Sequence, residues 1–544
     1  MNSDAKFSMK RELLVTDFLD RARNHYGDQE AVVATTGERY TYSEFGERAD
    51  RVSAALAERG IEKGDRVAVL DPNTHCHLES AYGIMQLGAI HTPLNYRLTP
   101  DDFEYILNDA GVDAIIADYE YAERIEDIRG AVPTETFVSN DAAKTEGDWE
   151  DFEEIIAETE PEYERPEMDE DEVITINYTS GTTGDPKGVM RTHRTESLHA
   201  YLITIHQEIR DDDTYLWTLP MFHVNGWGHI YAITGMGAKH VCTRGIDAGT
   251  IFEALVEEDV SYFCAAPTVL NLLIEYDEEH DPETTGTKDV RIATAGSAPP
   301  EATIRTVEDE FGWYLKHVYG ATETGPLITT SDARRLLGDG PERFSLKKRQ
   351  GIGYLGTEVA VVDEDGEDVA RDDASIGEIV VRGNQVMEGY WEKPEATEEA
   401  FNDRREGWYH TGDLAVVDEH GMVSIQDRKK DIIISGGENI SSIELEDTLF
   451  DHGGVSDVAV IPTPSDKWGE TPKAFIIPAT GNPDESGITE EEIREFTREK
   501  MAGYKVVSRV EFVDELPTTA TGKVQKYELR EQEWDDEDRM VGQG

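Results

Sequence analysis

The sequence predicts an α/β protein with a large N-terminal body of parallel-type sheets and helices, a small β-rich region, and a small mobile α+β lid at the C-terminus. Three observations lead to this fold class. Helix-to-strand units recur up to about residue 350, short alternating strands follow, and a compact α+β pattern begins after Lys430. Repeated helix–strand units are typical of parallel sheets that are covered on both faces.

The first unit begins at Tyr40, where Ser43 is the predicted N-cap of a helix. Apolar residues recur at helical spacing between 45 and 56, and Gly60 ends the helix before a strand over 66–70. The same alternation is repeated three times. It occurs in AYGIMQLGAIHTPLN, in FEYILNDAGVDAIIAD, and from IFEALVEEDVSYFCAAP into VRIATAG.

The sequence pattern changes after about residue 350. The short strands EVAVVDEDG, GEIVVRG and MVSIQDR are separated by Asp, Gly and Asn turns. The segments IIIS, SSIELEDTLF, DVAVIP, KAFIIPA, TEEEIREFTREKM and VSRVEFVD then alternate between strand and helix. We therefore expect an N-terminal domain over 1–429 and a lid domain over 430–544, which is within the usual domain size.

The charge balance is strongly acidic, with 114 Asp and Glu against 51 Lys and Arg and a net charge of -63. The acids are spread along the chain, so self-repulsion opposes a compact state unless salt screens it. This composition predicts a halophilic source. It also disfavours nucleic acid and anionic membranes as partners, because both need Lys and Arg to neutralise phosphate.

Location and metal content follow from other features. No window reaches about 18 apolar residues and the start lacks an apolar signal segment, which argues against membrane insertion or export. Three scattered cysteines fit a reducing cytoplasm. For His75-Cys76-His77 we expect no metal, because neighbours alternate sides on a strand and no second cluster completes a ligand set.

The segment YTSGTTGDPKG, which runs from Tyr178 to Gly188 behind the apolar VITIN, predicts a phosphate-binding loop. Its glycines let backbone N–H groups approach an anion closely. Lys187 is followed by glycine rather than Ser or Thr, which excludes an ordinary P-loop. The alternative, a flexible linker, fits the composition but not the position behind a buried strand.

A second glycine pattern, from Gly351 to Gly356, matches GxGxxG letter for letter. A dinucleotide fingerprint requires a strand before it and a helix after it. Here SLKKRQ precedes the pattern and the strand-like EVAVVD follows. We therefore do not expect dinucleotide binding.

Four later motifs follow YTSGTTGDPKG in order: YGATE, YHTGD, DRKKDIIISGGEN and PTTATGK. From about Arg39 to Leu529 the chain resembles the adenylate-forming superfamily of acyl-CoA synthetases, luciferases and peptide-synthetase adenylation domains. TLPMFHVNGWGH, SGGENISS and DKWGETPKAF further resemble ligases for short and medium-chain or methylthio-substituted acids. The resemblance implies that a carboxylate attacks the α-phosphate of ATP, and that the thiol of coenzyme A then displaces AMP.

The resemblance also implies roles for particular residues. Lys523 would orient the carboxylate, Thr322 would touch the α-phosphate, and Glu323, together with Thr182, would hold Mg²⁺. Tyr319 would stack on adenine, and Asp413 and Arg428 would bind the ribose. His223 and Trp227 would border the acyl pocket with Gly296, although Trp at that spacing is also common in plain core. The expected nucleotide- and CoA-binding residues are Thr179, Ser180, Gly181, Thr182, Thr183, Gly184, Lys187, Gly296, Ser297, Ala298, Tyr319, Gly320, Asp413, Arg428, Lys430, Gly436, Gly437 and Glu438.

We thus expect an AMP-forming carboxylic acid–CoA ligase that uses ATP, Mg²⁺ and coenzyme A, with a lid hinged at Lys430. One alternative is an adenylation enzyme that loads a carrier protein, although no carrier segment is present in the chain. Another is a silent nucleotide-binding module, which would be expected to lack Lys523 or Asp413, and both are present. The identity of the acid and the oligomeric state, a homodimer included, stay open.

The acidic composition predicts that the protein needs salt near molar concentration. At about 1 M salt the Debye length shrinks to about 3 Å and screens most of the repulsion. Dialysis into dilute buffer should therefore cause loss of activity and of the far-ultraviolet circular dichroism signal, and salt should restore both. Unchanged activity and an unchanged spectrum in dilute buffer would contradict this expectation.

Overall fold

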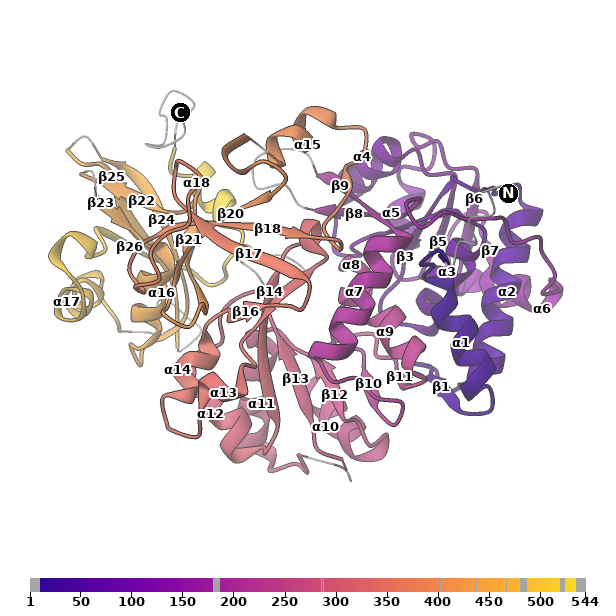
Figure 1. The fold of residues 1–544 in the computed structure, drawn as a ribbon, viewed down its shortest axis with the longest axis horizontal. Coiled ribbons are helices and arrows are strands. Elements are labelled where there is room, and N and C mark those ends of the chain that lie inside the picture. Colours follow the sequence, from indigo (N-terminus) through magenta and orange to yellow (C-terminus); the bar gives the residue numbers. More distant parts are fainter. Residues whose placement is uncertain are drawn as a thin grey trace, which may run out of the picture.

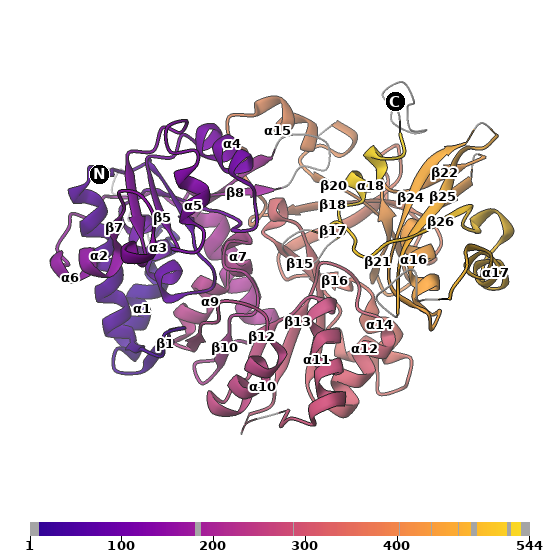
Figure 2. The same ribbon diagram turned by 180° about the vertical axis from the view of Figure 1, so that it is seen from behind.

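The computed structural model describes residues 10–179, 186–284, 286, 288–401, 403–436, 438–465, 467–479, 487–518 and 524–534. Two large sheets lie on either side of a layer of helices, and smaller β-rich units follow toward the C-terminus (Figure 1, Figure 2). This arrangement confirms the predicted α/β class with a β-rich region and an α+β C-terminal unit.

The first large sheet has nine strands and is parallel from the third strand of its order to the eighth. Its central strands are short and fully buried, as expected where helices cover both faces. In sheet order the strands are β16 (Ile352–Gly353), β15 (Leu327–Thr330), β14 (Tyr314–Gly320), β13 (Arg291–Thr294), β12 (Tyr262–Cys264), β10 (Thr214–Leu216), β11 (Lys239–Val241), β1 (Glu30–Val33) and β2 (Arg39–Thr41).

The second large sheet has eight strands. It is parallel from the third strand of its order onward, and two antiparallel strands form its other edge. In sheet order these are β19 (Gly389–Tyr390), β9 (Lys187–Thr192), β8 (Val173–Thr179), β4 (Ile90–Pro93), β3 (Arg66–Leu70), β5 (Ala114–Ala117), β6 (Thr136–Ser139) and β7 (Glu150–Asp151).

Helices between and outside the sheets supply most of the core. One buried cluster joins side chains of α1, α2, α3, α7 and α9 to strands of both sheets, and other clusters pack α4 and α5, or α10, α11, α12 and α14, on the outer faces. The helices up to the β-rich region are α1 (Thr16–Tyr26), α2 (Tyr42–Glu58), α3 (His75–Gln86), α4 (Pro100–Ala110), α5 (Ala122–Glu126), α6 (Phe152–Glu158), α7 (His193–His206), α8 (Val224–Trp227), α9 (His229–Met236), α10 (Ala248–Glu257), α11 (Pro267–His280), α12 (Glu301–Arg305), α13 (Arg334–Leu337) and α14 (Arg343–Lys348).

Helix α2 begins two residues earlier than the sequence suggested. Its N-cap is Thr41, whose side chain accepts from the backbone N–H of Glu44, while the Glu44 carboxylate accepts from the Thr41 backbone. The prediction of Ser43 as N-cap was wrong because this reciprocal capping box satisfies two helix-end donors at once. The strand that follows, β3, has the predicted bounds.

The β-rich region is a four-stranded antiparallel sheet with its own apolar face. The GxGxxG pattern lies between α14 and this sheet, and a strand rather than a helix follows Gly356. The geometry of a dinucleotide fold is therefore lacking at this pattern. The elements are β17 (Thr357–Val362), β18 (Gly377–Gly383), α15 (Pro394–Ala400), β20 (Tyr409–Val417) and β21 (Val423–Arg428).

The C-terminal unit is built on a five-stranded sheet whose two faces each carry a core cluster. It contacts the β-rich region through Asp427, which accepts from the Ser442 backbone N–H at 2.5 Å and from its hydroxyl at 3.1 Å. Its elements are β22 (Ile433–Ser435), β23 (Glu438–Ile440), α16 (Ser442–Phe450), β24 (Val455–Ser465), β25 (Gly469–Pro478), α17 (Glu490–Lys500), β26 (Arg509–Phe512) and α18 (Lys526–Glu531).

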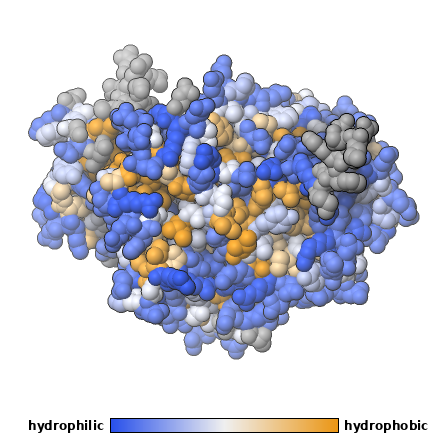
Figure 3. Space-filling view, in the orientation of Figure 1, coloured by the Kyte–Doolittle hydropathy of each residue, from blue (hydrophilic) through white to orange (hydrophobic). Residues whose placement is uncertain are grey.

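Hydrophilic residues cover most of the face in Figure 3, and hydrophobic residues gather near its middle. Within the described ranges, no helix has both the length and the apolar character of a membrane span.

Candidate active site

Three of the predicted nucleotide-binding residues meet where strands of different sheets end. Tyr319, near the end of β14, donates its hydroxyl to Asp413 Oδ2 at 2.6 Å. Arg428, which pairs with Asp413 across β20 and β21, places Nε 3.4 Å from Asp413 Oδ1. Burial, and then the Asp413 carboxylate, hold the pKa of Tyr319 well above its usual value, so its hydroxyl stays a donor.

The predicted phosphate loop connects β8 and β9, which form an antiparallel hairpin. Thr179 and Lys187 face each other across the hairpin. The loop between them holds five of the predicted residues, and these lie outside the described residues: Ser180, Gly181, Thr182, Thr183 and Gly184. The Lys187 ammonium group is 5.1 Å from the centre of the Tyr390 ring, a distance that permits a cation–π contact.

Thr322 and Glu323 lie on a single 3₁₀ turn over Thr322–Thr324, directly after β14. Tyr390 donates its hydroxyl to Glu323 Oε1 at 3.0 Å, and the Met387 N–H donates to the Glu323 carbonyl at 2.8 Å. Burial raises the pKa of Glu323. These contacts fix the turn against the chain that leads into β19.

Several basic side chains lie near Lys430 although the chain as a whole is acidic. Burial, and then the neighbouring cations Lys187, Arg428 and Arg530, lower the pKa of Lys430. Arg428 and Arg530 are each paired with a carboxylate, Asp413 and Asp431, which offsets part of this positive charge. Lys523, the remaining predicted cation, lies outside the described residues.

Two glycines of the predicted site are required by the backbone. Gly296, in the loop after β13, has a φ of 96°, a region that favours glycine. At Gly320 a Cβ atom would lie 1.6 Å from the carbonyl oxygen of Pro326, so a side chain there would push the Thr322–Glu323 turn away. Ser297 and Ala298 follow Gly296 in the same loop, and Gly296 and Ser297 are exposed.

Of the predicted acyl-pocket residues, His223 lies directly before a left-handed turn and Trp227 lies within it. Val224, Asn225, Gly226, Trp227 and Gly228 all have φ between 48° and 74°, a conformation that costs about 1–2 kcal/mol for each residue with a side chain.

The side chains at the two ends of this turn differ in their surroundings. Burial lowers the pKa of His223 to about 4, so its ring is neutral at physiological pH. Trp227 is only 7% exposed and belongs to the main core cluster.

The residues predicted to admit CoA lie on the C-terminal unit. Gly436 and Glu438, at the hairpin of β22 and β23, are exposed, and Gly437 between them is outside the described residues. The Gly436 N–H donates to the Trp468 carbonyl at 2.8 Å, and the Trp468 side chain is about half exposed. The hairpin therefore presents its backbone to solvent beside the exposed ring of Trp468, which lies in the connection between β24 and β25.

One set of residues beneath the site was missed by the sequence analysis. Arg191 on β9 is fully buried and donates Nε to Glu196 Oε1 at 2.6 Å. Its other nitrogens donate to the carbonyls of Gln385 at 2.8 Å and Gly325 at 2.9 Å. Asn225, within the left-handed turn, donates to the same Glu196 oxygen at 3.3 Å.

This buried network connects the Thr322–Glu323 turn to the left-handed turn after His223. Gly325 closes the loop that carries Thr322 and Glu323, and Asn225 belongs to the turn between His223 and Trp227. One feature of the sequence could have indicated this buried pair. Arg191 is a charged residue within the otherwise apolar segment GVMRT, and Glu196 follows it five residues later. Buried charges of this kind are retained where they are paired and hydrogen-bonded.

Comparison with known proteins agrees with this geometry. Residues 19–391 match the family described as AMP-binding enzyme, and residues 444–523 match the AMP-binding enzyme C-terminal domain. The two matched ranges contain the phosphate loop, the Thr322–Glu323 turn and Lys523. The chain belongs to the AMP-binding enzyme family.

Individual relatives resemble the chain over nearly its whole length. A 4-hydroxybutyrate–CoA ligase from Metallosphaera sedula is 38% identical over 94% of this chain and 93% of its own. A 2-methylpropanoate–CoA ligase from Humulus lupulus is 35% identical, with 94% of each chain covered. Among solved structures, an anthranilate CoA ligase in complex with anthranoyl-AMP superposes with a TM-score of 0.84 at 27% identity, covering 96% of this chain and 98% of that one.

The buried pair makes a testable prediction. Arg191→Met leaves the Glu196 carboxylate without its cation in the core, which typically costs about 3–5 kcal/mol of unfolding free energy. The exposed pair of Arg382 with Glu358 is the matched control, and Arg382→Met should cost about 0–1 kcal/mol. Urea unfolding of both variants measures the difference, and equal midpoints would contradict the assigned role of Arg191.

Proposed function

We propose that this AMP-forming acid–CoA ligase activates fatty and related carboxylic acids of short to medium length. The observation that carries the adenylation site is the contact of Tyr319 and Arg428 with Asp413, beside the cations Lys187 and Lys430. The acid class rests on the motifs MFHVNGW and SGGENISS. The names of two relatives, which specify 4-hydroxybutyrate and 2-methylpropanoate, support it.

In the first half-reaction a carboxylate oxygen attacks the α-phosphate, and pyrophosphate leaves. The Asp413 carboxylate accepts from the ribose hydroxyls, and Tyr319, oriented by Asp413, supplies a ring face for adenine. Lys187, with the glycine-rich loop before it, stabilises the departing phosphates. Lys523 offsets the charge that builds on the α-phosphate and orients the acid.

The site also fits a magnesium ion. Glu323 offers carboxylate oxygen, the ligand type that a hard cation prefers, and Tyr390 fixes its orientation through the 3.0 Å hydrogen bond. Thr182 would add a hydroxyl. When bound, Mg²⁺ supplies positive charge to the phosphate oxygens and so eases pyrophosphate release.

In the second half-reaction the CoA thiol displaces AMP from the acyl-adenylate. We propose that the chain divides at Lys430 into a body over 1–429 and a lid over 430–544, and that the lid turns between the two steps. The core of the C-terminal unit supports this division, because its sheet packs against its own helices α16 and α17. Gly436, Gly437 and Glu438 then line the entry of CoA.

Two other functions would need different observations. A carrier-loading enzyme would transfer the acyl group to a carrier protein in preference to CoA. A silent nucleotide-binding module would release no pyrophosphate when free acids and ATP are supplied. Assays of pyrophosphate release, and of CoA against a carrier as acceptor, separate these functions from the proposed one.

Lys523→Ala should slow adenylation by about 10² to 10³-fold, as expected for the loss of one electrostatic contact in the transition state. Given synthetic acyl-AMP, the same variant should still form acyl-CoA at close to the normal rate, because the lid occupies another position in that step. Rapid-quench measurement of each half-reaction tests this. Equal impairment of both steps would rule out separate lid positions.

Lys430→Pro should show the opposite defect, because proline fixes φ near -65° and restricts the hinge. We expect acyl-AMP to form while transfer to CoA becomes slow. Lys430→Ala is the matched control, since it removes the same charge without restricting the backbone. If both variants lose transfer to the same extent, charge rather than hinge motion is responsible.

The proposed acid class predicts that butyrate and hexanoate are used with a higher kcat/KM than palmitate. One methylene in an apolar pocket is worth about 1–3 kcal/mol, so a wall of fixed depth discriminates strongly by length. Trp227→Leu should shift the preferred length if the ring borders that wall. A panel of acids assayed with ATP, Mg²⁺ and CoA at high salt tests both statements, and a preference for palmitate would reverse the assignment.

A further inference from the structure

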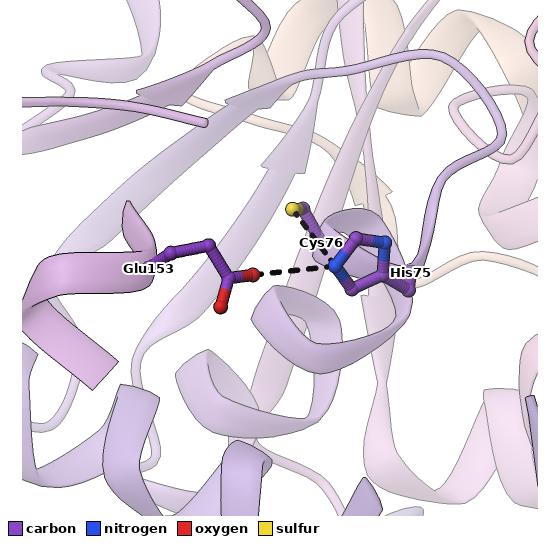
Figure 4. Close-up of side chains that lie close together, drawn as sticks. All are labelled: His75, Cys76 and Glu153. Atoms are coloured by element: carbon purple, nitrogen blue, oxygen red, sulfur yellow. Dashed lines mark hydrogen bonds and ion pairs between the residues drawn. The ribbon is translucent and has the colours of Figure 1, made fainter. Parts of the chain in front are cut away.

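A group of metal-ligating side chains lies apart from the residues assigned to catalysis. His75 and Cys76 begin helix α3, and Glu153 lies on α6 (Figure 4). One donor atom from each lies within 4.8 Å of the other two. Cys76 is a free, buried cysteine, His75 is buried, and Glu153 is exposed, so the group reaches from the protein interior to its surface.

The structure corrects the sequence-based interpretation of this segment. His75, Cys76 and His77 are helical and not on a strand, so the argument from alternating sides does not apply. His77 does not belong to this group of three side chains. Its Nδ1 lies 3.3 Å from the Asp71 carbonyl, and its ring packs on His91. The third member of the group is Glu153, which is 78 residues from His75 in the sequence and lies beside it in the fold.

The distances between the donor atoms match the edges of a tetrahedron around a small cation. His75 Nε2 is 3.3 Å from Glu153 Oε1 and 3.8 Å from Cys76 Sγ. With usual zinc–ligand bond lengths, tetrahedral geometry requires about 3.3 Å between nitrogen and oxygen and about 3.6 Å between nitrogen and sulfur. Two of the three edges are therefore within a few tenths of an ångström of zinc geometry, and the third, between Cys76 Sγ and the Glu153 carboxylate, is no longer than 4.8 Å.

The local charge also suits a divalent cation. Arg48 donates to Glu79 and to Glu153, each at 2.6 Å, so two carboxylates share one guanidinium. The two carboxylates and the guanidinium together carry one negative charge in excess. A divalent ion that releases the thiol proton to solvent brings the sum to zero.

We propose that His75 Nε2, Cys76 Sγ and Glu153 form a binding site for a thiophilic divalent cation of the Zn²⁺ class, with water in the fourth position. Nitrogen, thiolate and carboxylate together are typical zinc ligands, whereas Mg²⁺ and Ca²⁺ prefer oxygen alone. The ion links the start of α3 to α6, two helices that pack on the eight-stranded sheet. This site is distinct from the magnesium site at Glu323 and does not depend on the proposed function.

The test uses the untagged full-length chain, stripped of metal by a chelator and then titrated with Zn²⁺ in a calorimeter. We expect one equivalent to bind, with no competition from excess Mg²⁺. Co²⁺ in place of Zn²⁺ should give a thiolate charge-transfer absorption band. The variants Cys76→Ser and Glu153→Gln should each weaken Zn²⁺ binding by about tenfold or more.

Matched controls make the result specific to this group. Cys242→Ser and Cys264→Ser remove the other two buried free cysteines and should leave the Co²⁺ band and the Zn²⁺ affinity unchanged. Glu153 is exposed, so Glu153→Gln keeps the test valid even if the buried Cys76→Ser variant does not fold. The proposal is overturned if no equivalent binds, if Co²⁺ shows no thiolate band, or if Glu153→Gln binds Zn²⁺ as tightly as the parent chain.

Discussion

The buried pair of Arg191 and Glu196 is the constraint on which the candidate active site depends. Removing a guanidinium and a carboxylate from water costs several kcal/mol for each ion, and only good geometry with further hydrogen bonds offsets that cost. Arg191 meets this condition with donors to Glu196 and to two backbone carbonyls. Because those carbonyls belong to segments remote in sequence, satisfying the charge also fixes where the segments lie.

The same contacts explain how two sheets produce one site. Strand β9 belongs to the eight-stranded sheet, whereas Gly325 follows the last parallel strand of the nine-stranded sheet. Loops at the carboxyl ends of parallel strands are the usual place for ligands in open α/β sheets. Here the pair of charges anchors one such loop against a strand of the neighbouring sheet, and Tyr390 fixes the same loop through Glu323.

Electrostatics at the site oppose the charge of the whole molecule. A chain with a net charge of -63 repels an anionic nucleotide at long range. Burial, and then the neighbouring cations Lys187 and Arg428, lower the pKa of Lys430, so the field of these cations acts over a short distance. High salt would screen the long-range repulsion more strongly than this partly enclosed field.

Ordered sequence motifs predicted more of this structure than hydrophobic periodicity did. Helix–strand alternation gave the α/β class and the bounds of β3, and ordered motifs identified Tyr319, Asp413 and Arg428 before their contact was visible. The sequence did not predict contacts between residues that are far apart in the chain. Examples are the backbone partners of Arg191 and the position of Glu153 beside His75. Local rules also misplaced the N-cap of α2, because the capping box of Thr41 and Glu44 starts the helix two residues before the predicted Ser43.

The left-handed turn after His223 limits how the acyl site can evolve. Gly226 has no room for a side chain, because a Cβ atom there would lie 2.3 Å from the Trp217 ring. Most substitutions at Gly228 would meet a φ of 74°, which disfavours any residue with a Cβ atom. Engineering of acid preference by stepwise mutation is therefore better directed at side chains around the turn than at Gly226 or Gly228. Relatives that differ in substrate should vary around this turn while the glycines within it stay unchanged.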